Sequence, residues 1–201
     1  MAVIKTALEI ALEKTNSIKS DKSNIAQYEI RQEGKKLAND FLEGKADIKE
    51  ELKKASAEQR SNLKQGIFDV LVSQITLPSG KDDNSRIEKI GQGLSAIIEK
   101  NEFSEMFKQL IQIMGQYLQE QANFDQALRQ QYAPKLRQKE EELSRRYGRE
   151  VRIDPLQDPE FAAFYNQHMT ALKSNYEAII GQAREEAKRM FGLDSPGAAG
   201  S

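Results

Sequence analysis

The chain has 201 residues, of which 38% are hydrophobic and 30% are charged. Globular domains usually contain roughly 45–50% apolar residues when glycine is counted, so we expect slender helices with narrow apolar faces and a thin core. The formal net charge of −1 gives no overall field that would attract nucleic acid or an anionic membrane. Cysteine is absent, which excludes disulfides, thiolate metal sites and cysteine nucleophiles.

The start of the sequence, MAVIKT, lacks the basic stretch and the continuous apolar run of a secretory signal. No segment approaches the roughly 18 apolar residues of a membrane span. We therefore expect a soluble, cytoplasmic protein that has no membrane partner.

Apolar residues recur at helical spacing through residues 3–43, with a shift of phase midway. They are Ile4, Leu8, Ala11, Thr15, Ile18 and Ile25, followed by Ile30, Leu37 and Phe41. The Ser and Asn residues between 16 and 24 compete for backbone hydrogen bonds, so we expect a break or a bend there. Gly44 stands where a C-terminal cap is expected.

Residues 47–76 are predicted to form a second helix. Asp47 can cap it, and Glu50 three positions later completes an acidic capping box. The run from Ile67 to Ile75 also suits a strand, but no second strand-like run exists to pair with it. We therefore expect a helix here and no sheet in the chain.

The stretch LPSGKDDN at residues 77–84 is the clearest loop in the sequence, and it could also act as a hinge. A third helix is predicted from about Ser85 to Lys100, with a junction at Asn101. Its apolar face comprises Ile87, Ile90, Leu94, Ile97 and Ile98.

A helical arm is predicted over about residues 103–147. Its apolar stripe alternates steps of three and four residues and narrows along the chain, and glutamines gather around it. This pattern is typical of a coiled coil or of an extended helix. Pro134 should kink or break the arm near residues 130–133, and Gly148 should end it.

The last helix should begin with Asp158 as its N-cap and Pro159 in its first turn, after a loop at residues 149–157. It should end at Gly192, which can take the left-handed cap conformation. Residues 194–201 are expected to be a disordered tail.

Together these elements predict the fold class. We expect a single all-α domain over residues 1–193, built as a bundle of five to six amphipathic helices. A long, Pro-kinked, coiled-coil-like helical arm should extend from this bundle.

No motif in the sequence carries recognisable catalytic or metal chemistry. The chain has one histidine, His168, and the residue three before it is Tyr165, so the Glu-x-x-His motif of dinuclear metal bundles is absent. Neither a G-x-S-x-G elbow nor a phosphate-binding glycine loop occurs. We expect no metal, no cofactor and no enzyme activity, with His168 in a structural role.

The strongest electrostatic feature lies between Arg129 and Arg152, where eight basic and four acidic residues occur. The end of this window forms the basic cluster, Arg145, Arg146, Arg149 and Arg152, which could bind phosphates or an acidic partner. In the alternative interpretation, Arg145 and Arg146 stabilise a helix C-terminus, and neighbouring glutamates pair with the cations at i,i+4 spacing.

Three functions fit the sequence, and we favour the first. A non-catalytic protein would act through protein–protein contacts, as a homo-oligomer, scaffold or assembly factor, because long helices with narrow apolar stripes need partners. Its contact surface, called the seam below, would comprise Ile111, Met114, Leu118, Phe124 and Leu128.

The second function is an RNA, DNA or ribonucleoprotein binding module that uses the basic cluster. The third is a helical enzyme or small-ligand carrier with a pocket near Tyr165, His168 and Tyr176. Aromatic residues at helical spacing belong more often to a core, which favours the structural interpretation of this group.

Overall fold

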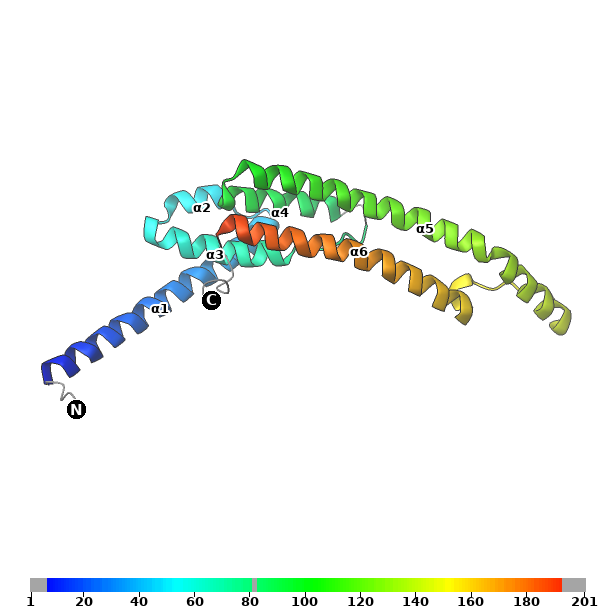
Figure 1. The fold of residues 1–201 in the computed structure, drawn as a ribbon, viewed down its shortest axis with the longest axis horizontal. Helices are drawn as coiled ribbons and strands as arrows, with labels where there is room; N and C mark the ends of the chain where they lie inside the picture. Colours follow the sequence, from blue (N-terminus) through cyan, green and yellow to red (C-terminus); the bar gives the residue numbers. More distant parts are fainter. Residues whose placement is uncertain (1–6, 81–82, 193–201) are drawn as a thin grey trace, which may run out of the picture. The chain divides into compact units, whose positions relative to one another are not determined.

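The computed structural model describes the backbone of residues 7–80 and 83–192, and the side chains from residue 24 onward in those ranges. The described residues form six α-helices and one 3-10 turn, without a strand, which confirms the all-α fold class (Figure 1). The elements are α1 (Ala7–Leu42), α2 (Ile48–Lys54), α3 (Ala57–Ser73), α4 (Asp83–Ile98), α5 (Asn101–Tyr147), η1 (Pro155–Gln157) and α6 (Pro159–Phe191). The tail expected at residues 194–201 lies outside the described residues.

Helix α1 runs without interruption, so the break expected near residues 16–24 is wrong. Ser and Asn lower helix stability by only about 0.5 kcal/mol each relative to alanine, and the helix continues on both sides of them. The predicted end is confirmed. Gly44 has a positive φ of 78°, and its amide donates to the carbonyl of Phe41 at 3.0 Å.

The helix predicted over residues 47–76 is in fact two helices, α2 and α3. Asp47 caps α2 as predicted, accepting from the amide of Glu50 at 3.0 Å. The true capping box begins α3: the Ser56 hydroxyl accepts from the Gln59 amide, and the Gln59 side chain accepts from the Ser56 amide, both at 3.3 Å. Because Ser56 satisfies the first free amides of a new helix, the chain can turn between α2 and α3.

The boundaries of α4 follow the predicted loop and junction. Its first residue, Asp83, accepts hydrogen bonds from the backbone amide and the hydroxyl of Ser79 at 2.7 and 2.6 Å. Its predicted apolar face is buried. Glu99 has a positive φ of 57°, so the helical path of α4 ends just before Asn101. The carboxylate of Glu99 pairs with Lys64 at 2.8 Å.

The contacts divide the chain into two compact units. The first comprises residues 1–75 and 89–100, and the second comprises residues 76–88 and 101–201. The single domain over residues 1–193 and the hinge at residues 77–84 stay predictions.

In the first unit, α1 and α3 cross so closely that only glycine fits. A Cβ atom on Gly34 would lie 2.3 Å from the carbonyl oxygen of Leu63, and one on Gly66 would lie 2.1 Å from that of Arg31. Beside this contact the Arg31 guanidinium pairs with the carboxylate of Asp69 at 2.7 Å. The two helices therefore meet backbone to backbone, which fixes the point at which they cross.

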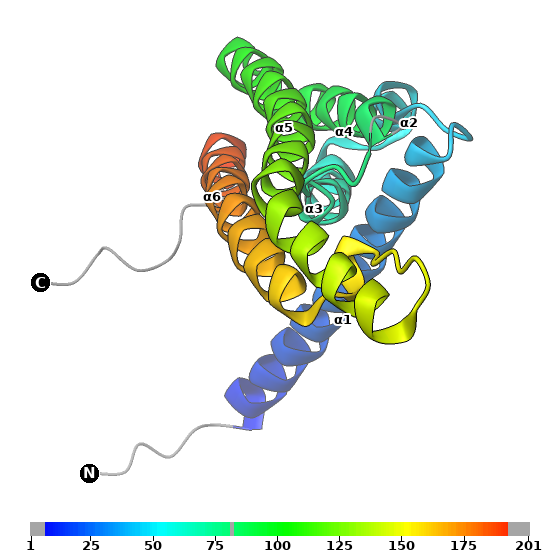
Figure 2. The ribbon, with the colours of Figure 1, turned by 90° about the vertical axis from the view of Figure 1, so that its right-hand side faces the viewer.

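In the second unit, α5 and α6 form an antiparallel hairpin, side by side in both views (Figure 1, Figure 2). Three ring contacts fix its register: Tyr132 with Phe161, Phe124 with His168, and Tyr117 with Tyr176, with centroids 5.0, 6.1 and 5.0 Å apart. The contacts recur every seven or eight residues on each helix, in opposite directions. That spacing keeps one face of each helix turned toward the other.

Helix α5 continues through Pro134 to Tyr147, so the break expected near residues 130–133 is wrong. Proline removes only the hydrogen bond that its own amide would have donated to the carbonyl of Gln130. Contacts with α6 lie on both sides of it, at Tyr132 and at Lys135. These contacts hold the helix together across the missing bond, while the expected kink stays a prediction.

Candidate functional site

A network of polar side chains in the second unit is centred on Asp158, the N-cap of α6. One carboxylate oxygen of Asp158 accepts from the backbone amides of Glu160 and Phe161, both at 3.0 Å. The residue is only 5% exposed, and it is the one buried charged residue among those that the structure describes. Pro159 follows in the first turn, so the predicted start of this helix is confirmed.

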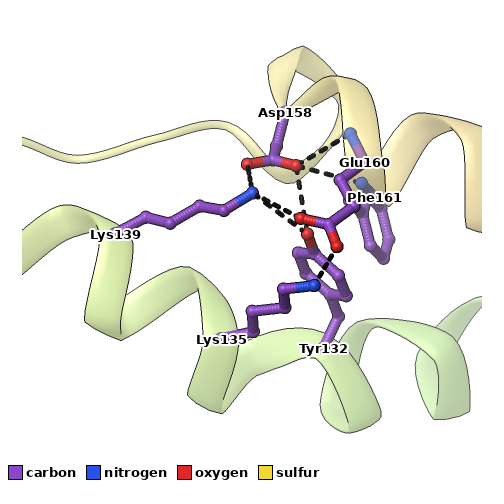
Figure 3. A network of polar contacts seen from close by, with 6 residues as sticks. All are labelled: Tyr132, Lys135, Lys139, Asp158, Glu160 and Phe161. Carbon is purple, nitrogen blue, oxygen red and sulfur yellow. Dashed lines mark hydrogen bonds and ion pairs between the residues drawn. The ribbon is translucent and has the colours of Figure 1, made fainter.

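Helix α5 supplies three further partners, which with Asp158 and Glu160 form the clamp (Figure 3). The Tyr132 hydroxyl donates to Asp158 at 3.1 Å. Lys139 donates to Asp158 at 2.6 Å and to Glu160 at 3.0 Å, and Lys135 pairs with the other oxygen of Glu160. The clamp joins the last third of α5 to the start of α6.

Electrostatics keep Asp158, Glu160 and Lys139 charged near neutral pH. The Lys139 ammonium, followed by the backbone amide of Phe161, holds the pKa of Asp158 at about 2. Lys135 and then Lys139 hold the pKa of Glu160 at about 2 as well. The two carboxylates raise the pKa of Lys139, with Asp158 the larger cause. Since these shifts move the groups away from neutral pH, the clamp suits a structural lock better than proton transfer.

The loop beyond the clamp is tied back onto α5. The amide of Val151 donates to the Ser144 hydroxyl, and the amide of Ile153 donates to the carboxylate of Glu140, both at 2.9 Å. Asp154 caps the 3-10 turn by accepting from the amide of Leu156 at 3.1 Å. We call residues 143–157 the tip of the hairpin. Side chains hold its backbone in one conformation.

The tip exposes two large apolar side chains. Tyr147 is 60% exposed and Leu156 is 47% exposed. Gly148, with φ of 65°, ends α5 as predicted, and Arg145 and Arg146 lie in its last turn. The tip is therefore an ordered surface with apolar and cationic groups on it.

The predicted basic excess is neutralised by residues beyond the window in which it was counted. Arg129 pairs with Asp125, while Lys135 and Lys139 pair with Asp158 and Glu160. Between residues 125 and 160 the sequence holds eight basic and eight acidic side chains. The net positive charge that favoured nucleic acid is therefore absent once the carboxylates that pair with these cations are counted.

Within the basic cluster itself, two of the four arginines pair with nearby glutamates. Arg145 lies 3.9 Å from Glu141, and Arg152 lies 3.0 Å from Glu150. Arg146 and Arg149 have no carboxylate within 4.0 Å among the side chains that the structure describes. All four arginines are exposed.

The seam does not form one free surface. Met114 and Leu128 are buried, Ile111 and Leu118 are half-buried, and only Phe124 is exposed, at 36%. The ring of Phe124 contacts His168 of α6. Much of the apolar stripe that suggested a partner is thus covered within this chain.

The aromatic group considered as a pocket is packed. His168 lies against Phe164, with ring centroids 4.6 Å apart, in addition to its contact with Phe124. The Tyr165 hydroxyl donates to Asp125 at 2.9 Å. Arg129 lowers the pKa of this carboxyl, whereas burial raises the pKa of Tyr165.

Each unit has an open groove lined by described residues. The first, about 490 Å³, lies between α1, α2 and α3, with Ile30, Leu37 and Leu63 among its apolar lining. The second, about 210 Å³, lies between α5 and α6, lined by residues such as Leu110 and Ala183. Neither is lined by His168, Tyr165 or Tyr176.

In the described part of the chain, no three Asp, Glu or His residues gather as a metal site would require. None of the helices described here has the length and apolar character needed to cross a bilayer.

Sequence reasoning missed the clamp and the Asp125 bridge. Asp158 was predicted as a cap, but its partners Tyr132 and Lys139 precede it by 26 and 19 residues. No local pattern links residues so far apart. The one usable signal was the heptad-like phase of α5, which places Tyr132 and Lys139 on one face because they are seven residues apart.

The fold defines an all-helical protein whose second unit is a clamped antiparallel hairpin. Residues 49–189 match the model of a family of unknown function, DUF6657, and the chain belongs to this family. The match begins in α2 and ends near the end of α6, so α1 lies outside it. No curated protein and no solved structure matches the chain.

Proposed function

We propose that the protein is non-catalytic and acts through protein–protein contacts, with the hairpin tip as the surface that a partner protein binds. The observation that carries this proposal is an ordered tip with Tyr147 and Leu156 exposed. Large apolar side chains on a pre-formed surface favour binding, because little conformational entropy is lost when a partner docks. An isolated exposed apolar residue would not carry this argument.

Charge suggests the kind of partner. Arg146 and Arg149 lack a paired carboxylate in the described part of the chain and lie on either side of Tyr147 and Gly148 in sequence. A protein surface with an apolar centre and an acidic rim would complement them. Nucleic acid is the alternative partner for the same arginines, although the balanced charge of the hairpin argues against it.

We also propose that α5 and α6 pair as an antiparallel coiled coil. Ring contacts at steps of seven and eight residues support this geometry. A stiff hairpin of this kind would hold the tip at the end of α5 and α6, within the second unit.

The test compares affinity capture by three versions of the full chain from the extract of its own cells. They are the wild type, the double variant Tyr147→Ser with Leu156→Ser, and a control with Asn166→Ala and Gln167→Ala on the exposed side of α6. We expect the wild type and the control to retain the same protein, and the tip variant to lose it. Identical capture by all three would overturn the proposal.

A nuclease-treated arm of the same experiment separates the two kinds of partner. Retention of the protein after nuclease treatment is the expected result. Loss on nuclease treatment, together with binding that weakens steeply as salt rises, would replace the proposal by nucleic-acid binding.

A further inference from the structure

Helix α1 carries a second apolar face that is not used by its contact with α3. Ile25 is 58% exposed and Tyr28 is 63% exposed, whereas Gly34 and Ala38 are buried. Nine residues separate Ile25 from Gly34, which is about two and a half turns. Ile25 therefore lies on the opposite side of α1 from the glycine at the crossing.

The sequence continues this outward face toward the start of α1. Apolar or short residues precede Ile25 at alternating steps of three and four, with one interruption at Lys22: Leu8, Ala11, Thr15 and Ile18. Steps of this kind define the seam of a two-helix coiled coil. The first half of α1 runs beyond α2 and α3 in both views (Figure 1, Figure 2). An isolated helix of this length is in general only marginally stable in water.

The charges along α1 favour a second copy running in the opposite direction. In the sequence, Glu9 and Glu13 belong to the first half of the segment, and Lys19 and Lys22 belong to the second half. Two antiparallel copies set the acidic half of each against the basic half of the other, whereas parallel copies set like charges together.

The same register satisfies the apolar positions. When Thr15 of one copy is level with Ile18 of the other, Leu8 is level with Ile25 and Ala11 with Lys22. In this arrangement the two remaining charges, Lys14 and Asp21, also fall on the same flank of the pair and face each other across it. One register therefore pairs the apolar positions, except that Lys22 faces Ala11, and it sets Lys14 opposite Asp21.

We propose that the outward face of α1 pairs with the same face of a second copy of this chain, in antiparallel orientation. The proposal goes beyond the proposed function, because it names a second protein partner, another copy of this chain, and places it away from the tip. Helix α1 lies outside the residues that match the family, so this pairing would use a segment that the family model does not cover.

Sedimentation equilibrium of the full chain at micromolar concentration tests the pairing. The wild type should sediment as a dimer, and Ile25→Glu combined with Tyr28→Glu should weaken dimerisation by at least about tenfold. Leu156→Glu is the matched control, since it also places a carboxylate at an exposed apolar site, and it should stay dimeric. A monomeric wild type, or a double variant as dimeric as the wild type, would overturn the proposal.

Disulfide cross-linking tests the orientation without interference, because the chain has no cysteine. Chains with Ala11→Cys and chains with Lys22→Cys should form a mixed disulfide when combined. Each alone should not cross-link, since identical positions would lie about 16 Å apart along the pair at 1.5 Å per residue. Cross-linking of each variant alone would indicate parallel pairing, and no cross-linking in the mixture would exclude this register. Either result contradicts the proposal.

The two surfaces can fail independently. If the α1 variant is monomeric and still retains the partner of the tip, both proposals stand. If it is monomeric and captures nothing while the tip variant captures normally, the function belongs to α1 and the tip proposal fails.

Discussion

The crossing of α1 and α3 and the hairpin of α5 and α6 join helices by opposite means. At the crossing, Gly34 and Gly66 bring two backbones into direct contact, and an added methyl group has no space. In the hairpin, rings such as Tyr132 and Phe161 fill a wider gap, and the clamp locks one end. The crossing should therefore be sensitive to added atoms, and the hairpin to removed ones.

The largest effect is expected in the hairpin, from Phe161→Ala. Phe161 is fully buried and its ring contacts Tyr132 and Tyr165. Removing such a side chain from a core usually costs about 3–5 kcal/mol. Denaturant unfolding should show this loss, and hydrogen exchange should place the opening in α5 and α6. A loss well below 1 kcal/mol would mean that the rings do not hold the hairpin together.

A somewhat smaller loss is expected at the crossing, from Gly66→Ala. The new methyl would lie 2.1 Å from the carbonyl oxygen of Arg31, so α1 and α3 must separate. Overpacking of this kind costs about 2–3 kcal/mol, even after the helical gain of alanine over glycine. Denaturant unfolding measures it, and exchange should rise in α1 and α3. Unchanged or increased stability would show that the two backbones do not meet here.

Acid should weaken the clamp. Because the pKa values of Asp158 and Glu160 are lowered to about 2 in the folded protein, their contribution to stability is complete above their ordinary values and is lost as pH falls toward 2. The melting temperature should therefore drop between about pH 4.5 and pH 2.

The double variant Asp158→Asn with Glu160→Gln tests the assignment of this acid effect. Asparagine can still cap α6, so the fold should persist at neutral pH. The fall in melting temperature with acid should be smaller than in the wild type. An equal fall in both proteins would assign the acid sensitivity to other carboxylates.

The smallest effect is a gain in stability from Gly115→Ala in α5. A Cβ atom there meets nothing within 4 Å. Alanine should stabilise the helix by about 0.5–1 kcal/mol because it loses less backbone entropy. This variant is the matched control for Gly66→Ala, since the substitution is the same and only the surroundings differ. If Gly115→Ala also lowered stability, the loss in Gly66→Ala could not be assigned to the close packing of α1 and α3.

Local chemistry allowed the helix ends to be predicted from the sequence. Asp47, Asp158, Gly44 and Gly192 cap helices as expected, because a cap depends on residues within one turn of it. The signal for the start of α3 was also present, as Ser56 followed three residues later by Gln59, but the continuous apolar stripe favoured one long helix. The break expected in α1 was wrong because Ser and Asn disfavour a helix only weakly, and the helix continues on both sides of them. The break expected in α5 was wrong because one proline removes a single backbone hydrogen bond from a long helix.

The site could not be predicted in the same way, because its partners meet only after folding. The basic excess between Arg129 and Arg152 was real in the sequence, yet its neutralising carboxylates lie beyond that window. The same holds for the seam, where Met114 and Leu128 are buried within the chain. Patterns along one helix reveal an apolar or charged face but not what covers it.

The most direct test of the proposed contact surface is hydrogen exchange by mass spectrometry on the captured complex and on the free protein. We expect the partner to protect the amides of the tip, residues 143–157, and to leave those around Ile111 and Leu118 unchanged. If the partner protected the amides around Ile111 and Leu118 and left the tip unprotected, the seam and not the tip would be the contact surface. That result would contradict the proposal.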